Sequence, residues 1–513
     1  MNKKQFYTNS VSGIIQLLFT ALLTFICIPI FISKLGVVNY GIFAIISLIG
    51  NLTVFANLGF STMLTKYLSE QGKCDESDFD ILVTIVLMLI VISIPSFLII
   101  YFNQFFLIKL FKIPIQSLAP SKTLYICLVF ANIFLFLGQV SIAIIAALQK
   151  IYINNLLQFI NAAIYWISII IVVSLGYGLG EIGYLILASA IIWFVLSFVI
   201  AFKNWGKLNY FGVIDNFKRI VKKQLVFGSK IYVAGIVIFL FEPMTKLLIS
   251  SFIGIKEVGY FDIAIKVKNQ LQGVIARLFD PFFPFISQLK DMGKIKFAVI
   301  DIAQKYFLIA IPFTASLIFI VKPLLTLWLG NSNNPDIIFG CILIPVSYLL
   351  FSSSILPVYF FLISKGLAGK TIILHMSNAV VNASIIFLLY KKLGYTSVVL
   401  GISGGIFSSF LFGIYYQKKY LGIMLFESFN QLQDFLLSFI IIITFNGVYC
   451  YFESNIYLQV IGIVTITIIL TIFTYRWLAL VNIKDIKMYL GADNHVSDFL
   501  IKLFIKSKNG TFK

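Results

Sequence analysis

A group of ionisable side chains inside an otherwise apolar segment is the part of the sequence that could do chemistry. Residues 259–284 read GYFDIAIKVKNQLQGVIARLFDPFFP and contain Asp262, Lys266, Lys268, Arg277 and Asp280. Lysine and arginine bind anions such as phosphate, whereas a carboxylate surrounded by apolar residues can carry or gate a cation. The segment therefore predicts a place where a charged ligand is bound or gated.

The spacing of these residues places them on one side of a helix. At about 100° per residue, the positions near Asp262 fall within about 60° of it. Those positions are Lys266, Asn269, Gly273, Arg277 and Asp280, whereas Lys268 lies on another face. An exposed charge at the centre of a bilayer costs several kcal/mol, so this polar face must meet protein or water.

The preceding apolar segment supplies further charges, namely Lys230, Glu242 and Lys246. If the two segments form an antiparallel hairpin around 252–257, Lys246 lies at the depth of Asp262 and Glu242 at the depth of Lys266. One interpretation is that these pairs are salt bridges that hold the hairpin together. The other is that the groups line a cavity and bind or gate something charged.

The balance of charge in this region favours an anionic ligand. The segments 226–251, 257–285 and 298–320 contain the cations Lys230, Lys246, Lys266, Lys268, Arg277 and Lys305 and the anions Glu242, Asp262, Asp280 and Asp301. Cations in excess in a low-dielectric enclosure attract groups such as phosphate. The candidate ligands of an anionic head group are Lys266, Arg277, Lys246, Lys230 and Asn269. The candidates for ion coupling or gating are Glu242, Asp262 and Asp280.

The composition shows what kind of chain must position these groups. It is 60% hydrophobic and 12% charged, whereas soluble domains are about 25% charged. A helix needs about 20 apolar residues to cross a bilayer core, and such runs recur along the whole chain. About fourteen spans are predicted, near 11–33, 39–62, 81–103, 123–148, 152–176, 180–202, 226–251, 257–285, 298–320, 336–363, 367–390, 395–416, 433–452 and 456–478. The chain is thus predicted to be an all-α polytopic membrane protein.

The net charge of +19 reports membrane topology. With the N-terminus placed in the cytoplasm, the inside segments hold roughly three times as many Lys and Arg residues as the outside segments. This positive-inside pattern predicts that both termini are cytoplasmic. The basic surface is then expected to contact anionic lipid, and nucleic acid is not expected as a partner.

The predicted spans group into two halves that resemble each other. The junction of the first two spans reads GVVNYGIFAI from Gly36, and the junction at the corresponding hairpin of the second half reads GIKEVGYFDI from Gly254. Both fit GxxxxGxFxI, which favours a duplication, and repeated halves are typical of alternating-access transporters. The expected organisation is an N-lobe at 1–205, a cytoplasmic connector at 206–225, a C-lobe at 226–420, two extra spans within 433–478 and a basic cytoplasmic tail at 479–513. The connector is expected to lie on the inner membrane surface.

The sequence contains none of the common catalytic or metal-binding motifs. HExxH, CxxC and GxSxG are absent, and the five cysteines are scattered. No enzymatic activity, catalytic residue, metal or cofactor is predicted.

Several short stretches, taken in order, resemble a known family. They are SKLGVVNYGIFAI, VFANLGFSTMLTKYLSE, IGIKEVGYFDIAIKV, FDPFFPFISQL and LLTLWLGN. In order and spacing they resemble polysaccharide-unit (O-antigen) flippases of the Wzx type, which belong to the multidrug/oligosaccharidyl-lipid/polysaccharide exporter superfamily. The likeness covers roughly residues 8–480.

The resemblance implies a fold, a substrate and partners. The fold would be two six-helix lobes in a V, as in MATE transporters, plus two C-terminal helices. The substrate would be an oligosaccharide on undecaprenyl pyrophosphate, moved across the bacterial cytoplasmic (inner) membrane for O-antigen, lipopolysaccharide or other surface polysaccharide synthesis. Protein partners would be a polysaccharide polymerase and a chain-length regulator.

Relatives are thought to line the cavity with basic residues, which points to Lys266 and Arg277 here. Some relatives also have basic residues on the first two spans, which this chain lacks, so the anion site is expected in the second lobe.

Two alternatives remain open from the sequence. One is a multidrug or organic-ion extruder of the same superfamily, for which unpaired acidic residues would be expected in the cavity. The other is a non-transporting scaffold of a glycan-assembly complex, which would not need a polar face accessible to water.

Overall fold

The computed structural model describes residues 3–51, 60–211, 213, 216–222, 224, 241–279, 286, 289, 291–330, 334–423, 432–478 and 480. These residues fall into two compact units, Met1–Asp262 and Ile263–Lys513. The boundary lies within one helix, α10 (Ile255–Phe279), so that its first two turns belong to the first unit. The lobe boundaries expected near 205 and 226 remain predictions.

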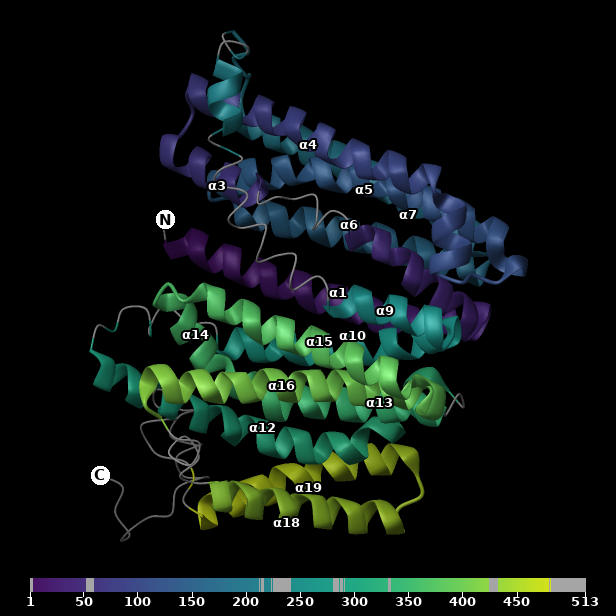
Figure 1. Cartoon of the computed structure of the whole chain (residues 1–513), viewed down its shortest axis with the longest axis vertical. Helices are drawn as coiled ribbons and strands as arrows, with labels where there is room; N and C mark the ends of the chain where they lie inside the picture. Colours follow the sequence, from purple (N-terminus) through teal and green to yellow (C-terminus); the bar gives the residue numbers. More distant parts are fainter. Residues whose placement is uncertain are drawn as a thin grey trace. The chain divides into compact units, whose positions relative to one another are not determined.

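The described residues of the first unit are mostly helical (Figure 1). Its elements are α1 (Lys3–Ile46), η1 (Ser47–Asn51), α3 (Phe60–Gln71), α4 (Asp75–Tyr101), η2 (Phe105–Leu110), η3 (Ile115–Ser117), α5 (Leu118–Ala147), α6 (Ile151–Ser174), α7 (Leu179–Trp205), α9 (Phe241–Phe252) and the start of α10. α1 contains two helices that meet at Gly36, whose φ of 80° suits glycine. This kink is the turn between the first two predicted spans.

The described residues of the second unit are also mostly helical. After α10 it contains α12 (Met292–Leu329), α13 (Pro335–Ser347), η4 (Tyr348–Ser352), η5 (Ser353–Ile355), α14 (Leu356–Ser364), α15 (Ala368–Leu393), α16 (Tyr395–Leu421), α18 (Leu432–Phe452) and α19 (Ile456–Trp477). α18 and α19 coincide with the two extra spans predicted at 433–452 and 456–478.

The predicted fold class is confirmed. Among the described residues, 11 helices are long and apolar enough to cross a membrane, so the chain is an all-α, multi-pass membrane protein. The greater part of the span predicted at 226–251 and the end of that predicted at 257–285 lie outside the described residues. Most of the other predicted spans coincide, to within a few residues, with one observed helix. The span predicted at 39–62 does not, because helix geometry changes at η1 and residues 52–59 lie outside the described residues. The span predicted at 336–363 is divided among α13, η4, η5 and α14.

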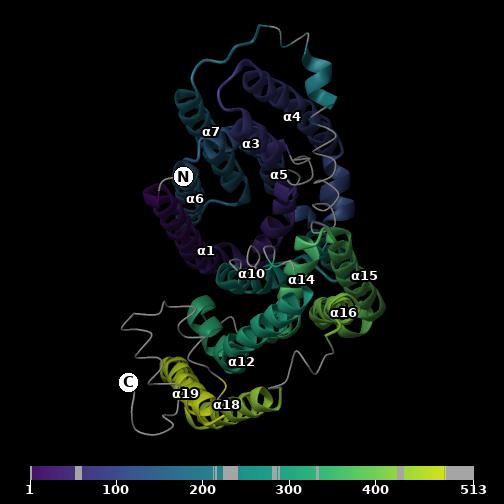
Figure 2. The same cartoon turned by 90° about the vertical axis from the view of Figure 1, so that its left-hand side faces the viewer.

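Small residues allow the helices of the first unit to pack closely. α5 and α7 lie side by side (Figures 1 and 2), and Gly138 of α5 faces the indole of Trp193 on α7. A Cβ at Gly138 would come within 2.3 Å of that ring. In a membrane, where lipid is as apolar as the helix surface, such close approach provides much of the helix–helix attraction.

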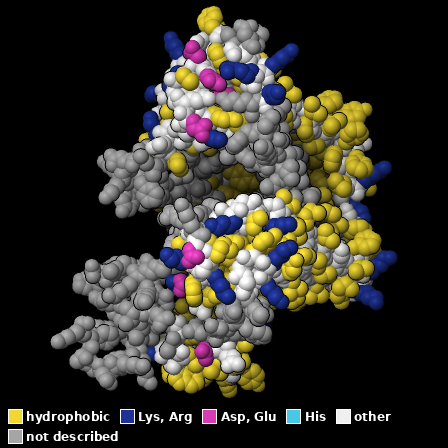
Figure 3. All heavy atoms as spheres, turned by 60° about the vertical axis from the view of Figure 1, so that its left-hand side comes forward, with side chains coloured by type: hydrophobic (Ala, Val, Ile, Leu, Met, Phe, Trp, Pro, Cys, Tyr) yellow, Lys and Arg dark blue, Asp and Glu magenta, His cyan; other side chains and the backbone are white. Residues whose placement is uncertain are grey.

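The surface of each unit has the distribution expected for a membrane protein. Figure 3 shows hydrophobic side chains along the flanks of the helices and Lys, Arg, Asp and Glu side chains toward the helix ends. Exposed apolar residues such as Phe97 on α4 and Phe387 on α15 belong to these flanks. A broad apolar band between charged ends is what the hydrocarbon core of a bilayer requires.

The described part of the connector, 206–211, 213, 216–222 and 224, is attached to the start of α4. Ile220 is fully buried and packs with Phe79 and Val83 of α4, and Arg219 lies 3.8 Å from Glu76. Part of the apolar side of the connector is thus buried against α4, and the expectation that the connector lies on the inner membrane surface remains a prediction. The predicted tail at 479–513 lies almost wholly outside the described residues.

Candidate functional site

Two helix hairpins of the first unit meet at their ends. One is the kink of α1 at Gly36, and the other is the turn between α9 and α10 at Gly254. These are the two copies of the GxxxxGxFxI pattern. The second glycine of each copy lies at the contact, since a Cβ on Gly41 would be 2.1 Å from the carbonyl oxygen of Ile255, and a Cβ on Gly259 would be 3.2 Å from that of Val37. The repeated pattern therefore includes the two places where these hairpins require a glycine.

A buried charged cluster formed by Tyr40, Glu242, Lys246 and Asp262 lies next to this contact. Lys246 Nζ donates to Asp262 Oδ1 at 2.7 Å, and Tyr40 Oη donates to Asp262 Oδ2 at 2.6 Å. Lys246 Nζ also lies 3.5 Å from Glu242 Oε1, one turn earlier on α9. Each carboxylate oxygen of Asp262 thus accepts a hydrogen bond, one from Lys246 in its own hairpin and the other from Tyr40 in the α1 hairpin.

Burial makes these contacts strong but also costly to break. Tyr40, Lys246 and Asp262 are 2%, 6% and 5% exposed, respectively, whereas the side chain of Glu242 is 34% exposed. A buried ion that loses its partner keeps its desolvation penalty without the compensating attraction. The cluster therefore fixes α1 against α9 and α10 as long as Asp262 stays ionised.

The buried charged cluster tests the two ion pairs that the sequence predicted. The predicted Lys246–Asp262 pair is confirmed, but Glu242 contacts Lys246 and not the predicted Lys266. The ammonium of Lys246 is held between two carboxylates. To bind an anionic head group, as the sequence predicted, Lys246 would have to break its ion pair with Asp262.

The polar face predicted beyond Asp262 continues along α10 into the second unit. Lys266 is half-buried and Asn269 is exposed, and a Cβ on Gly273 would meet no atom within 4 Å. The opposite side of the helix is packed, with Ile263, Ala264 and Ile275 buried. Positions 269 and 273 thus face open space, as a polar stripe in contact with water requires.

Other predicted site residues are placed separately or not at all. Lys268, off the stripe, donates to Gln272 at 2.9 Å and lies over the ring of Tyr348. Asp301 and Lys305, one turn apart on α12, form an ion pair at 2.6 Å. Lys230 and Asp280 lie outside the described residues, as does the side chain of Arg277, so the roles predicted for them remain predictions.

Sequence reasoning missed Tyr40. A single tyrosine in an apolar helix gives no charge signal, and its partner is 222 residues away along the chain. The available signal was its position directly before Gly41, in one copy of the repeated pattern whose other copy contains Asp262.

The sequence predicts neither a metal nor a cofactor. Within the described residues, no three His, Cys, Asp or Glu side chains gather in a way that could hold a metal ion.

The family of the chain follows from a comparison with family models. The model described as "Polysaccharide biosynthesis protein" matches residues 7–290. The chain belongs to this polysaccharide biosynthesis protein family. The matched region includes every residue of the buried charged cluster and the whole of α10. A search of curated proteins gives no significant match.

Solved structures show the same fold as this family member. The lipid II flippase MurJ in an inward closed conformation is 17% identical, with a TM-score of 0.73, covering 90% of this chain and 98% of that one. A multidrug resistance MATE family transporter of the MOP superfamily, in an inward-facing conformation, is 16% identical, with a TM-score of 0.65, covering 80% and 98%. The MATE multidrug transporter DinF-BH is 13% identical, with a TM-score of 0.57, covering 82% and 97%. At these identities the likeness establishes the fold and leaves the substrate to be argued.

Proposed function

We propose that this chain is a flippase that moves undecaprenyl-pyrophosphate-linked oligosaccharide units across the bacterial cytoplasmic membrane by alternating access. The units would serve O-antigen or another surface polysaccharide, and both termini would be cytoplasmic, in keeping with the positive-inside pattern. The chain would supply binding and movement without catalysis. A polysaccharide polymerase and a chain-length regulator would act on the units after transfer.

The family match over residues 7–290 is the observation that carries this proposal. It names polysaccharide synthesis, and the MurJ-like fold supplies a way to move a lipid-linked saccharide. The half-buried Lys266 and the open positions 269 and 273 support a hydrated face for a pyrophosphate on α10. Lys266 and Arg277 are proposed to contact the pyrophosphate, with Lys230 and Asn269 nearby.

The buried charged cluster is proposed to lock one end of the transport path. Tyr40 belongs to the predicted N-lobe, and Lys246 and Asp262 belong to the predicted C-lobe. Their contact would therefore tie the two predicted lobes at hairpin ends that the predicted topology puts outside. Alternating access requires that such a contact break and re-form in every cycle. Protonation of Asp262 would remove the charge that holds Lys246 and Tyr40, and Glu242 and Asp280 are further candidates for coupling or gating.

A second candidate is an organic-cation extruder. It is favoured by the two carboxylates of Glu242 and Asp262 in the cluster, of which Glu242 has a side chain that is 34% exposed and could meet a cation. Such a protein would move a lipophilic cation and would have no need of the cationic face of α10.

Reconstitution into liposomes separates these functions. Lipid-linked oligosaccharide extracted from a bacterium that makes this chain is incorporated on both leaflets, and the fraction digested by a glycosidase added outside is measured. The proposal predicts digestion of nearly all of the lipid with the protein and of about half without it, while ethidium efflux stays at the level of empty liposomes. Ethidium efflux without oligosaccharide transfer would support the extruder, and movement of neither molecule would support the scaffold.

A further inference from the structure

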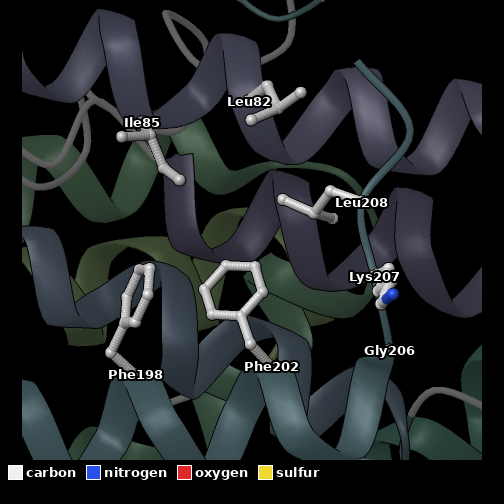
Figure 4. Close-up of a pocket in the computed structure, with 7 residues that line it drawn as sticks. All are labelled: Leu82, Ile85, Phe198, Phe202, Gly206, Lys207 and Leu208. Atoms are coloured by element: carbon white, nitrogen blue, oxygen red, sulfur yellow. The ribbon is translucent and has the colours of Figure 1, made fainter. Parts of the chain in front are cut away.

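An open groove runs along the first unit between α4 and α7 (Figure 4). Its volume is about 510 Å³, within the range of about 300–1,000 Å³ that is common for small-molecule sites. The walls are Leu82 and Ile85 of α4 on one side and Phe198 and Phe202 of α7 on the other. Both helices are long and apolar enough to span a membrane. The groove is therefore lined by side chains that favour a hydrocarbon chain.

One end of the groove carries a positive charge. Gly206, Lys207 and Leu208, which follow the last turn of α7, complete the lining, and Lys207 is its only charged member. The side chains of Lys207 and of nearby Lys203 are exposed, and neither forms an ion pair within the described residues. Lipid phosphates lie at the ends of membrane-spanning helices, where lysines attract them.

The loop that carries Lys207 is held in place by the buried carboxylate of Asp78 at the start of α4. Asp78 accepts from Trp205 Nε1 at 2.7 Å and from the Asn209 backbone N–H at 2.9 Å. It also pairs with Lys73 at 2.5 Å, and Lys73 Nζ donates to the carbonyl oxygen of Lys207 at 2.8 Å. Asp78 pairs with Lys73, and exposed Asp75 accepts from Asn209 Nδ2 at 3.0 Å, so that among the residues that line the groove the charge is that of Lys207, with Lys203 nearby.

We propose that this groove binds one anionic phospholipid, its acyl chain between α4 and α7 and its phosphate at Lys207. The charge of Lys207 favours an anionic lipid, since a zwitterionic head group contains its own cation and is attracted less strongly by a lysine. The anchored loop decides the position, because the three hydrogen bonds and the ion pair around Asp78 hold the lysine backbone beside the apolar walls before any lipid arrives. This site is separate from the buried charged cluster and does not depend on which substrate the protein moves.

Native mass spectrometry of the full-length protein in detergent tests the proposal. The probes are phosphatidylglycerol and phosphatidylcholine with the same acyl chains, and the measured quantity is the dissociation constant of the first bound lipid. Wild-type protein is expected to bind phosphatidylglycerol more tightly. Lys207→Gln should weaken that binding about fivefold, the factor for about 1 kcal/mol per lysine near a lipid surface, and leave phosphatidylcholine unchanged. The matched control, Lys222→Gln, removes an exposed lysine of the connector that does not line the groove.

A second variant tests the apolar part of the groove without removing any charge. Leu82→Trp fills the space between α4 and α7 and should weaken both lipids, whereas Phe211→Trp, at an exposed position outside the groove, should weaken neither. Equal affinity of wild-type protein for the two lipids would overturn the proposal. So would unchanged phosphatidylglycerol binding in both Lys207→Gln and Leu82→Trp.

Discussion

Asp262 determines the properties of the candidate site at the level of single residues. Its carboxylate accepts from Lys246 and Tyr40 at 2.7 and 2.6 Å while being 5% exposed. A buried ion pair of this kind is often no more stabilising than apolar residues of similar volume, but removal of one partner is strongly destabilising. The arrangement therefore suits a contact that must form and break more than one that only adds stability.

A comparison of single and double replacement of the ion pair follows from this asymmetry. Lys246→Ala should lower the free energy of unfolding by about 3–5 kcal/mol, since Asp262 remains buried without its cation. Lys246→Met combined with Asp262→Leu should recover most of that loss, because no unpaired ion remains buried and the carboxylate of Glu242, which is left, is 34% exposed. Thermal unfolding in detergent measures both, with Lys109→Ala at an exposed position as the control. A double variant no more stable than Lys246→Ala would contradict the proposed pairing.

At the scale of helices, the same region depends on how closely α1 and α10 approach. The glycines of the repeated pattern, Gly41 and Gly259, lie against backbone atoms of the opposite hairpin, and backbone cannot move aside as a flexible side chain can. Small residues thus let the two hairpins come close enough for Tyr40 to reach Asp262. The polar stripe of α10 begins at this contact and continues toward the open positions 269 and 273.

Two glycine substitutions distinguish close packing from open space. Gly41→Ala should destabilise the protein by about 1–3 kcal/mol, as overpacking usually does, because the new Cβ overlaps the carbonyl of Ile255. Gly273→Ala, the matched control within a helix, should stabilise by about 0.5–1 kcal/mol, since its Cβ meets nothing and alanine favours helix. Thermal unfolding of both variants provides the measurement. Equal effects would show that the hairpin contact is not formed.

At the scale of the whole molecule, the sequence predicted what depends on local composition. Apolar runs of about 20 residues located the spans, and α18 and α19 begin and end within a residue or two of the expected positions. The Lys246–Asp262 pair was also predictable, since hairpin geometry relates residues near one turn.

What the sequence could not predict depends on contacts between distant segments. Tyr40 has its partner in another hairpin, and the hydrogen bonds of Asp78 come from a loop more than 120 residues further along. The same limit applies to the connector, whose amphipathic pattern fits a membrane surface and a protein surface equally well. Only the structure shows that Ile220 is buried against α4.

The central claim is that the polar face of α10 handles the pyrophosphate of a lipid-linked oligosaccharide. The most direct test is the liposome assay of oligosaccharide transfer with Lys266→Ala, Arg277→Ala and the control Lys268→Ala, which lies on the same helix but off the polar face. We predict that the first two variants lose at least about tenfold in transfer rate, as expected for removal of a charge-assisted contact, while Lys268→Ala keeps the wild-type rate. Wild-type rates in both Lys266→Ala and Arg277→Ala would contradict the account.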